Sequence, residues 1–169
     1  MKKFKLKMPT EKDWDDWSND PPRDCVTTWN RGHAKQKFFG KTIEQVIPEL
    51  KRNFMGYYDE FCDMPRRCFQ YYIFAITEIL KEFAESGSKE ERYSISDMAS
   101  CFLSFFKSRA KNDPKSLKPI MKLIWPELER VANNQYKFYA PVDIYGDFKD
   151  HLAEIKKLCD ENKIEYLDP

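Results

Sequence analysis

The chain has 169 residues, of which 41% are hydrophobic, 15% aromatic and 34% charged, and its 29 basic residues nearly balance 28 acidic ones. This length is typical of one domain that buries a real hydrophobic core. The balanced charge argues against a large basic nucleic-acid-binding surface and against an acidic mimic of nucleic acid, and the aromatic and aliphatic content argues against a disordered chain.

The first 41 residues show little hydrophobic periodicity. Phe4, Leu6 and Met8 alternate with lysines, which is typical of a short strand or an extended arm. The tract DWDDWSNDPP follows, and its Asp, Asn, Ser and Pro residues predict a loop or a single turn. We interpret residues 1–41 as an irregular N-terminal arm that contains at most one short helix, around residues 25–29.

Helical periodicity begins at Thr42. Thr42 and Gln45 fit a capping box, and Pro48 predicts a kink or a restart of the helix that follows. Three later stretches also carry apolar residues at helical spacing, over residues 94–112, 113–131 and 147–161. The predicted fold is therefore all-α, a compact bundle of five or six helices in a single domain over residues 1–169, with a helical core over residues 42–162.

The most regular pattern lies in residues 63–83, DMPRRCFQYYIFAITEILKEF. Its apolar residues recur at i, i+3, i+4, i+7, i+11 and i+14, which places them on one stripe of a helix. The residues of this stripe are Phe69, Tyr72, Ile73, Ile76, Leu80 and Phe83. We predict that this is the central core helix, with Asp63 as its N-cap and with Arg66, Gln70 and Thr77 on its other faces.

No pattern in the sequence predicts catalysis, a metal site or a cofactor. His33 and His151 have no second histidine or cysteine at i+3 or i+4, and HExxH, CxxC, GxxxxGK[ST] and GxGxxG patterns are absent. Cys68 is the most suggestive thiol, because it follows Arg66 and Arg67 in the first turns of a helix, where the pKa of a thiol falls. The simpler interpretation, a small core residue, is favoured, and we expect a protein that is not an enzyme.

The cysteines and the apolar runs predict a compartment. Five scattered cysteines, an odd number, are typical of reduced thiols in a cytoplasmic protein. No stretch approaches the roughly 20 apolar residues of a membrane span, and residues 1–14 hold no apolar stretch long enough for a signal sequence. We therefore expect a cytoplasmic protein without membrane contact.

Aromatic residues outside the helical stripes favour protein recognition, because Tyr and Trp are enriched at interface hot spots. They include Tyr71, Tyr93, Tyr136, Tyr139 and Tyr145. Where such rings stand beside carboxylates, an acidic and aromatic surface would suit a basic partner such as a nuclease. The residues predicted to form this partner-binding surface are Trp14, Trp17, Tyr57, Tyr58, Asp59 and Glu60.

The alternative is a nucleic-acid-binding or regulatory helical domain. Lysines around phenylalanines can follow a phosphate backbone while the rings stack on bases. The residues that would do so are Lys35, Lys37, Phe38, Phe39 and Lys41. Lysine-rich segments also keep ordinary soluble domains from aggregating, and no RNP-type motif or recognition helix accompanies these residues, so nucleic-acid binding takes second place.

In size, helical content, aromatic surplus and lack of catalytic motifs, the chain resembles small cytosolic bacterial proteins that bind and neutralise a cognate toxin, or that act as adaptors. The resemblance implies a non-enzymatic protein-binding domain, in its finer form a toxin-neutralising immunity protein whose partner is the cognate toxin. It assigns no residue to a site, because it rests on general character and on no shared motif.

Overall fold

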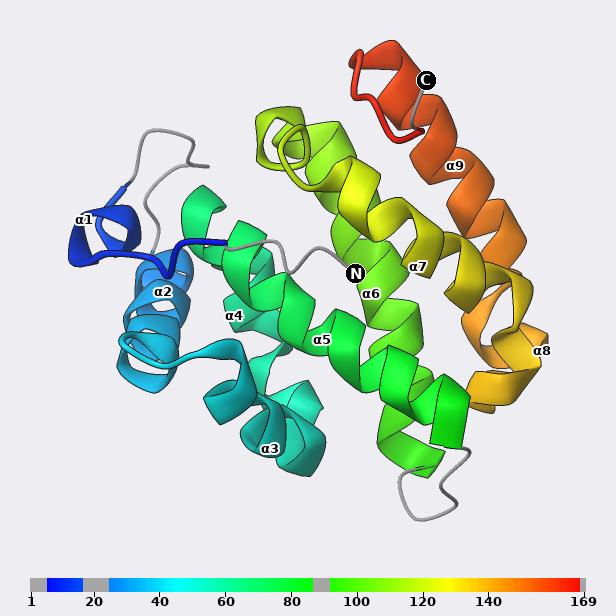
Figure 1. Ribbon diagram of the computed structural model, residues 1–169, viewed down its shortest axis with the longest axis horizontal. Coiled ribbons are helices and arrows are strands. Elements are labelled where there is room, and N and C mark those ends of the chain that lie inside the picture. The colour runs from blue at the N-terminus through cyan, green and yellow to red at the C-terminus, as the bar shows by residue number, and fades with distance from the viewer. Residues whose placement is uncertain (1–5, 17–24, 87–91, 168–169) are drawn as a thin grey trace.

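The computed structural model describes residues 6–16, 25–86 and 92–167, and every regular element within these ranges is a helix (Figure 1). The prediction of an all-α bundle is therefore confirmed. The α-helices are α1 (Glu11–Trp14), α2 (Cys25–Phe38), α3 (Ile43–Asn53), α4 (Tyr58–Asp63), α5 (Arg66–Ser86), α6 (Arg92–Asn112), α7 (Met121–Asn133), α8 (Val142–Tyr145) and α9 (Phe148–Glu161). Three 3₁₀-helices join them, η1 (Phe54–Tyr57), η2 (Pro114–Ser116) and η3 (Gln135–Phe138).

Helix α5 runs through the middle of the molecule (Figure 1). Helices α1 and α3 pack against it on one side, and α6 and α7 pack against it on the other. Helix α2 packs on α4, whereas α9 packs on α6 and α7. As a result, α2 and α8 lie near opposite ends of the long axis of the molecule (Figure 1).

The predicted apolar stripe of α5 is buried throughout, from Phe69 to Phe83. Gln70 and Thr77, which we predicted to lie on other faces of this helix than the apolar stripe, are buried as well. The Gln70 side-chain amide donates to the Ser116 carbonyl oxygen (2.9 Å), and the Thr77 hydroxyl donates to a carbonyl of its own helix. Helices pack on both sides of α5, so its polar residues need internal hydrogen-bond partners.

The interpretation of residues 1–41 as an irregular arm is wrong for α2, which is a 14-residue helix. Its buried face is largely polar, so it shows no apolar period. Asn30 Nδ2 donates to the Asp63 carboxylate (2.6 Å), and Arg31 Nε donates to the Asp63 carbonyl oxygen (2.8 Å). Asp63 therefore fastens α2 to the end of α4, and it is not the N-cap of α5, which begins at Arg66.

Three local predictions within the first 50 residues have different outcomes. Residues 6–10 form no strand, and Phe4 lies outside the described residues. The capping box of α3 is confirmed, because the Thr42 amide donates to Gln45 Oε1 (2.9 Å) and the Gln45 amide donates to Thr42 Oγ1 (3.4 Å). Helix α3 continues through Pro48 as one element, so of the predicted kink or restart, the restart is wrong.

Arg109 of α6 joins three helices around the short link between α4 and α5. Its Nη2 donates to the Met64 carbonyl oxygen (2.6 Å) and to two carbonyl oxygens of α4. The guanidinium lies 4.5 Å from the centre of the Phe69 ring. Asp113 accepts hydrogen bonds from Arg109 and from Arg66, the first residue of α5. These bonds give a donor to carbonyls at the end of α4 and in the link, which have no partner within a helix.

The central position of α5 generates a stability prediction. Ile76→Asp places a charge without a partner at a fully buried site, so we expect it to destabilise the fold by roughly 4 kcal/mol or more. Circular dichroism should show the loss of the helical signal or of a cooperative urea transition. Glu78→Ala, an exposed change on the same helix, is the control, and a native transition in both variants would contradict the core assignment.

Candidate partner-binding surface

Three of the residues predicted to form a partner-binding surface are buried. Trp14, Tyr57 and Glu60 each expose less than a tenth of their area, so the expectation that they are exposed is wrong. Asp59 is exposed and Tyr58 is half-buried. Trp17 lies outside the described residues. The acidic and aromatic residues near α4 therefore do not form one continuous exposed surface.

The buried members of this set have partners inside the protein. The Tyr57 hydroxyl donates to Glu49 Oε1 (2.5 Å), and burial raises the pKa of Tyr57 to about 12. Glu60 pairs with Nδ1 of His33. The Trp14 ring packs against the ring of Tyr72, with the ring centres 5.8 Å apart. The sequence could not reveal these internal contacts, because the local sequence around a Tyr or Glu does not show whether its partner lies inside the protein or is solvent.

The residues of the nucleic-acid alternative are also divided by the fold. Phe38 is buried, with its ring centre 5.3 Å from that of Tyr72, so it cannot stack on a base. Lys35 Nζ lies 2.9 Å from the Asp15 carboxylate, and the hydrogen bond to Asp15 raises the pKa of Lys35. Phe39 and Lys41 are exposed, whereas Lys37 is half-buried. The basic segment therefore retains few side chains that could contact nucleic acid together.

The residues considered for catalysis do not come together. Cys68 is fully buried, and burial raises the pKa of its thiol, so the favoured interpretation as a core residue is confirmed. His33 lies on α2 and His151 on α9. Among the residues whose positions the structure describes, no three His, Cys, Asp or Glu side chains gather in a way that could hold a metal ion.

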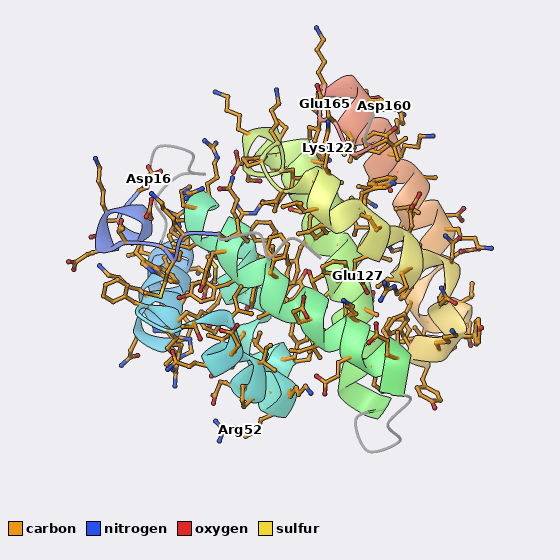
Figure 2. All side chains as sticks on the ribbon, viewed as in Figure 1. Asp16, Arg52, Lys122, Glu127, Asp160 and Glu165 are labelled. Carbon is orange, nitrogen blue, oxygen red and sulfur yellow. The ribbon has the colours of Figure 1, made fainter. Side chains whose placement is uncertain are left out.

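Glu127 of α7 is a buried carboxyl between α5 and α7 (Figure 2). Its Oε1 accepts no hydrogen bond from any described group, and its Oε2 lies 3.4 Å from Nη1 of Arg130. Burial raises the pKa of Glu127, and the negative charges of Glu78 and Glu85 act in the same direction. The positive charges of Arg130 and Lys81 oppose this shift without cancelling it.

We expect Glu127→Gln to stabilise the protein at neutral pH, because the unfolded chain solvates the charged carboxylate better than the folded protein does. Because the pKa of Glu127 is raised in the folded protein, the folded state holds the proton of this carboxyl more tightly than the unfolded state does. The wild type therefore loses stability relative to the variant as the pH rises through the folded pKa, and the difference vanishes below the ordinary pKa of 4.5. Urea unfolding of both proteins from pH 4 to pH 8 measures this. A difference in unfolding free energy that does not change with pH would contradict a raised pKa for Glu127. So would the same pH-dependent difference in Glu129→Gln, a change on the exposed face of α7.

Exposed apolar side chains gather in the segment that joins α7 to α9, residues 134–147, which we call the connector. Tyr136 is 73% exposed and Ile144 is 71% exposed, and Tyr139 and Val142 are exposed as well. These four are among eleven large apolar residues exposed in the described chain, so more than a third of them lie within nine residues. Exposed apolar residues concentrated on one short segment make a better candidate for an interaction surface than single exposed residues do.

One side chain holds the two ends of the connector together. The Gln135 Nε2 donates to the carbonyl oxygens of Ala140 (2.9 Å) and Gly146 (2.8 Å), and its Oε1 accepts from the amide of Phe148 (2.9 Å). A glutamine amide can make several hydrogen bonds at once. The backbone of the connector is therefore fixed at its start, its middle and its end.

The connector is also fastened to the core. The Tyr145 hydroxyl donates to the Asp97 carboxylate of α6 (2.8 Å). Phe138 is buried, and its ring centre lies 6.1 Å from that of Phe83 on α5. Tyr139 has a φ of 52°, in the left-handed region that a tyrosine rarely adopts. Strained backbone of this kind persists where its surroundings enforce it, and it is concentrated at functional sites.

A hollow of about 580 Å³ lies beside the connector, between α7 and the start of α9. The rings of Tyr136 and Tyr139, together with Pro141 and Val142, form much of its lining. Lys149 also lines it. A mostly apolar hollow with a few polar groups is the usual form of a binding site. The sequence pattern singled out Tyr136 and Tyr139 only as tyrosines outside the helical stripes, and it could not show that they stand together.

Comparison of the chain with models of known protein families, with curated proteins and with solved structures gave no match. Within the described ranges, the structure contains no helix with the length and apolar character needed to span a membrane.

The hydrogen bonds of Gln135 generate a prediction about the connector. Gln135→Ala leaves two carbonyl oxygens and one amide without their partner, so we expect a loss of about 2–3 kcal/mol in unfolding free energy. Hydrogen exchange of connector amides should become faster. Asn133→Ala, at an exposed neighbouring position, should change stability by less than about 0.5 kcal/mol. Unchanged exchange in Gln135→Ala would show that the glutamine does not hold the connector.

Proposed function

We propose that this protein is a non-enzymatic protein-binding domain that docks its partner on the connector. The observation that carries the proposal is the group of four exposed apolar side chains, Tyr136, Tyr139, Val142 and Ile144, on a segment whose backbone is held at both ends. Tyrosines in such positions are typical of hot spots, because they bury a large area when bound.

The rigidity of the connector supports the proposal energetically. Binding costs free energy when loops and side chains become ordered at the interface, and a preformed surface lowers that cost. Gln135 fixes the backbone beneath the aromatic residues, and Tyr145 fastens it to α6. The hollow next to Tyr136 and Tyr139 would accept a side chain or loop of the partner.

The charges around the connector bear on the kind of partner. Lys137 and Lys149 are exposed, and so are Asp143, Asp147 and Asp150. This mixture suits an interface with an apolar centre and a polar rim of both signs, and it does not require a strongly basic partner. Within this function, we propose that the partner is a cognate toxin that the protein neutralises by covering it.

Capture of the partner from native cells tests the proposal. We expect the tagged wild-type chain to retain a stoichiometric protein, and Tyr136→Ser and Ile144→Ser each to weaken its binding by about 2 kcal/mol, roughly thirty-fold. Isothermal titration calorimetry with the purified partner measures the affinity. Met55→Ser, an exposed apolar change outside the connector and outside the exposed face of α2, is the control and should leave the affinity unchanged.

Three outcomes separate the alternatives. If Tyr136→Ser and Ile144→Ser both bind the partner with wild-type affinity, the connector is not the binding site. Capture of nucleic acid in place of protein would contradict protein binding. For the finer proposal, the captured partner should arrest growth when it is expressed alone, and co-expression of the wild-type chain should restore growth. A harmless partner would leave protein binding intact but contradict toxin neutralisation.

A further inference from the structure

The outer face of α2 carries no charge. In this helix, all of whose residues are described, Arg31 is buried, and Lys35 and Lys37 are half-buried. The exposed residues are Cys25, Val26, Thr28, Trp29, Gly32 and Gln36. In a chain that is 34% charged, an exposed helix face without a charged residue is unusual, because charged residues normally cover such faces.

Gly32 lies in the middle of this face. A side-chain carbon added there would meet no atom within 4 Å, and the backbone does not have the positive φ that favours glycine. Glycine destabilises a helix interior relative to alanine. Neither backbone geometry nor lack of space inside the protein requires a glycine here, and the missing side chain leaves room on this face for a group that approaches from outside.

Trp29 lies three residues before Gly32, on the same exposed face of α2. Its side chain is 64% exposed. The indole stacks on the ring of His33, with the ring centres 5.1 Å apart and the planes 17° apart. His33 in turn stacks on Tyr57 and pairs with the buried Glu60. The exposed indole is therefore held in place, which lowers the entropic cost of burying it in an interface.

A twofold axis across this face would bring Trp29 of one copy against Gly32 of a second copy. If two copies of α2 pack antiparallel about a point between residues 30 and 31, position i of one copy faces position 61 − i of the other. Trp29 then faces Gly32 of the second copy, and Cys25 faces Gln36. Symmetric dimers use one self-complementary patch in this way. None of the six exposed residues of this face is charged, so no two like charges of the face itself meet across the axis.

We propose that the protein forms a symmetric dimer through the outer face of α2, with Trp29 of each copy packed over Gly32 of the other. The occupant of this face is thus a second copy of the chain. Because α2 and α8 lie near opposite ends of the molecule (Figure 1), the dimer leaves both connectors accessible. The proposal does not depend on the function of the connector.

Sedimentation equilibrium of the full chain tests the dimer. We expect a monomer–dimer equilibrium for the wild type at about 100 µM or below, and at least a roughly ten-fold weaker association for Trp29→Ser. Gly32→Ala should weaken the dimer while raising the unfolding midpoint of the dilute monomer, because alanine stabilises the helix. A purely structural role of Gly32 cannot produce these opposite effects. Tyr136→Ser on the connector is the control and should dimerise like the wild type.

A cross-link tests the antiparallel register directly. Gln36→Cys should form an intermolecular disulfide with the native, exposed Cys25 under mild oxidation, and peptide mass mapping identifies the linked pair. A wild-type chain that stays monomeric at about 100 µM overturns the proposal, as does a dimer that Trp29→Ser and Gly32→Ala leave unchanged. A disulfide that links position 36 to position 36 would overturn the proposed register.

Discussion

Helix α5 is buried over most of its circumference, and the rest of the structure is arranged to satisfy that constraint. Helices from both halves of the chain pack on it, so its polar side chains must bond internally, as Gln70 does with Ser116. Arg109 completes the arrangement, because it supplies hydrogen bonds to the carbonyls at the link into α5. The two surfaces proposed to bind partners, the outer face of α2 and the connector, lie near opposite ends of this filled centre (Figure 1).

The sequence predicts the elements whose buried faces are apolar, and it fails where a buried face is polar. The stripe of α5 and the capping box of α3 could be identified because hydrophobic periodicity and side-chain capping leave local patterns. Helix α2 could not, because Asn30 and Arg31 anchor it through hydrogen bonds to residues far along the chain. For the same reason Tyr57 and Glu60 looked like surface residues, although Glu49 and His33 pair with them inside the fold.

The connector and the exposed face of α2 share one physical feature. In each, a polar side chain fixes aromatic residues that stand in solvent: Gln135 holds the backbone of the connector, and His33 supports the ring of Trp29. Fixed aromatic side chains lose little conformational entropy on binding. A chain with one such surface at each end can form a symmetric dimer through α2 and still present two connectors to partners, which raises the avidity for a partner with repeated sites.

The most direct test of the connector as the recognition surface is hydrogen exchange of the full chain, measured alone and in complex with the partner it captures. If the partner binds the connector, exchange should slow on binding for the amides of residues 134–147 and of the start of α9, where the exposed tyrosines and the hollow lie. The amides of α2 should be unaffected by the partner. Protection confined to α2 and α4, with the connector unchanged, would contradict the account.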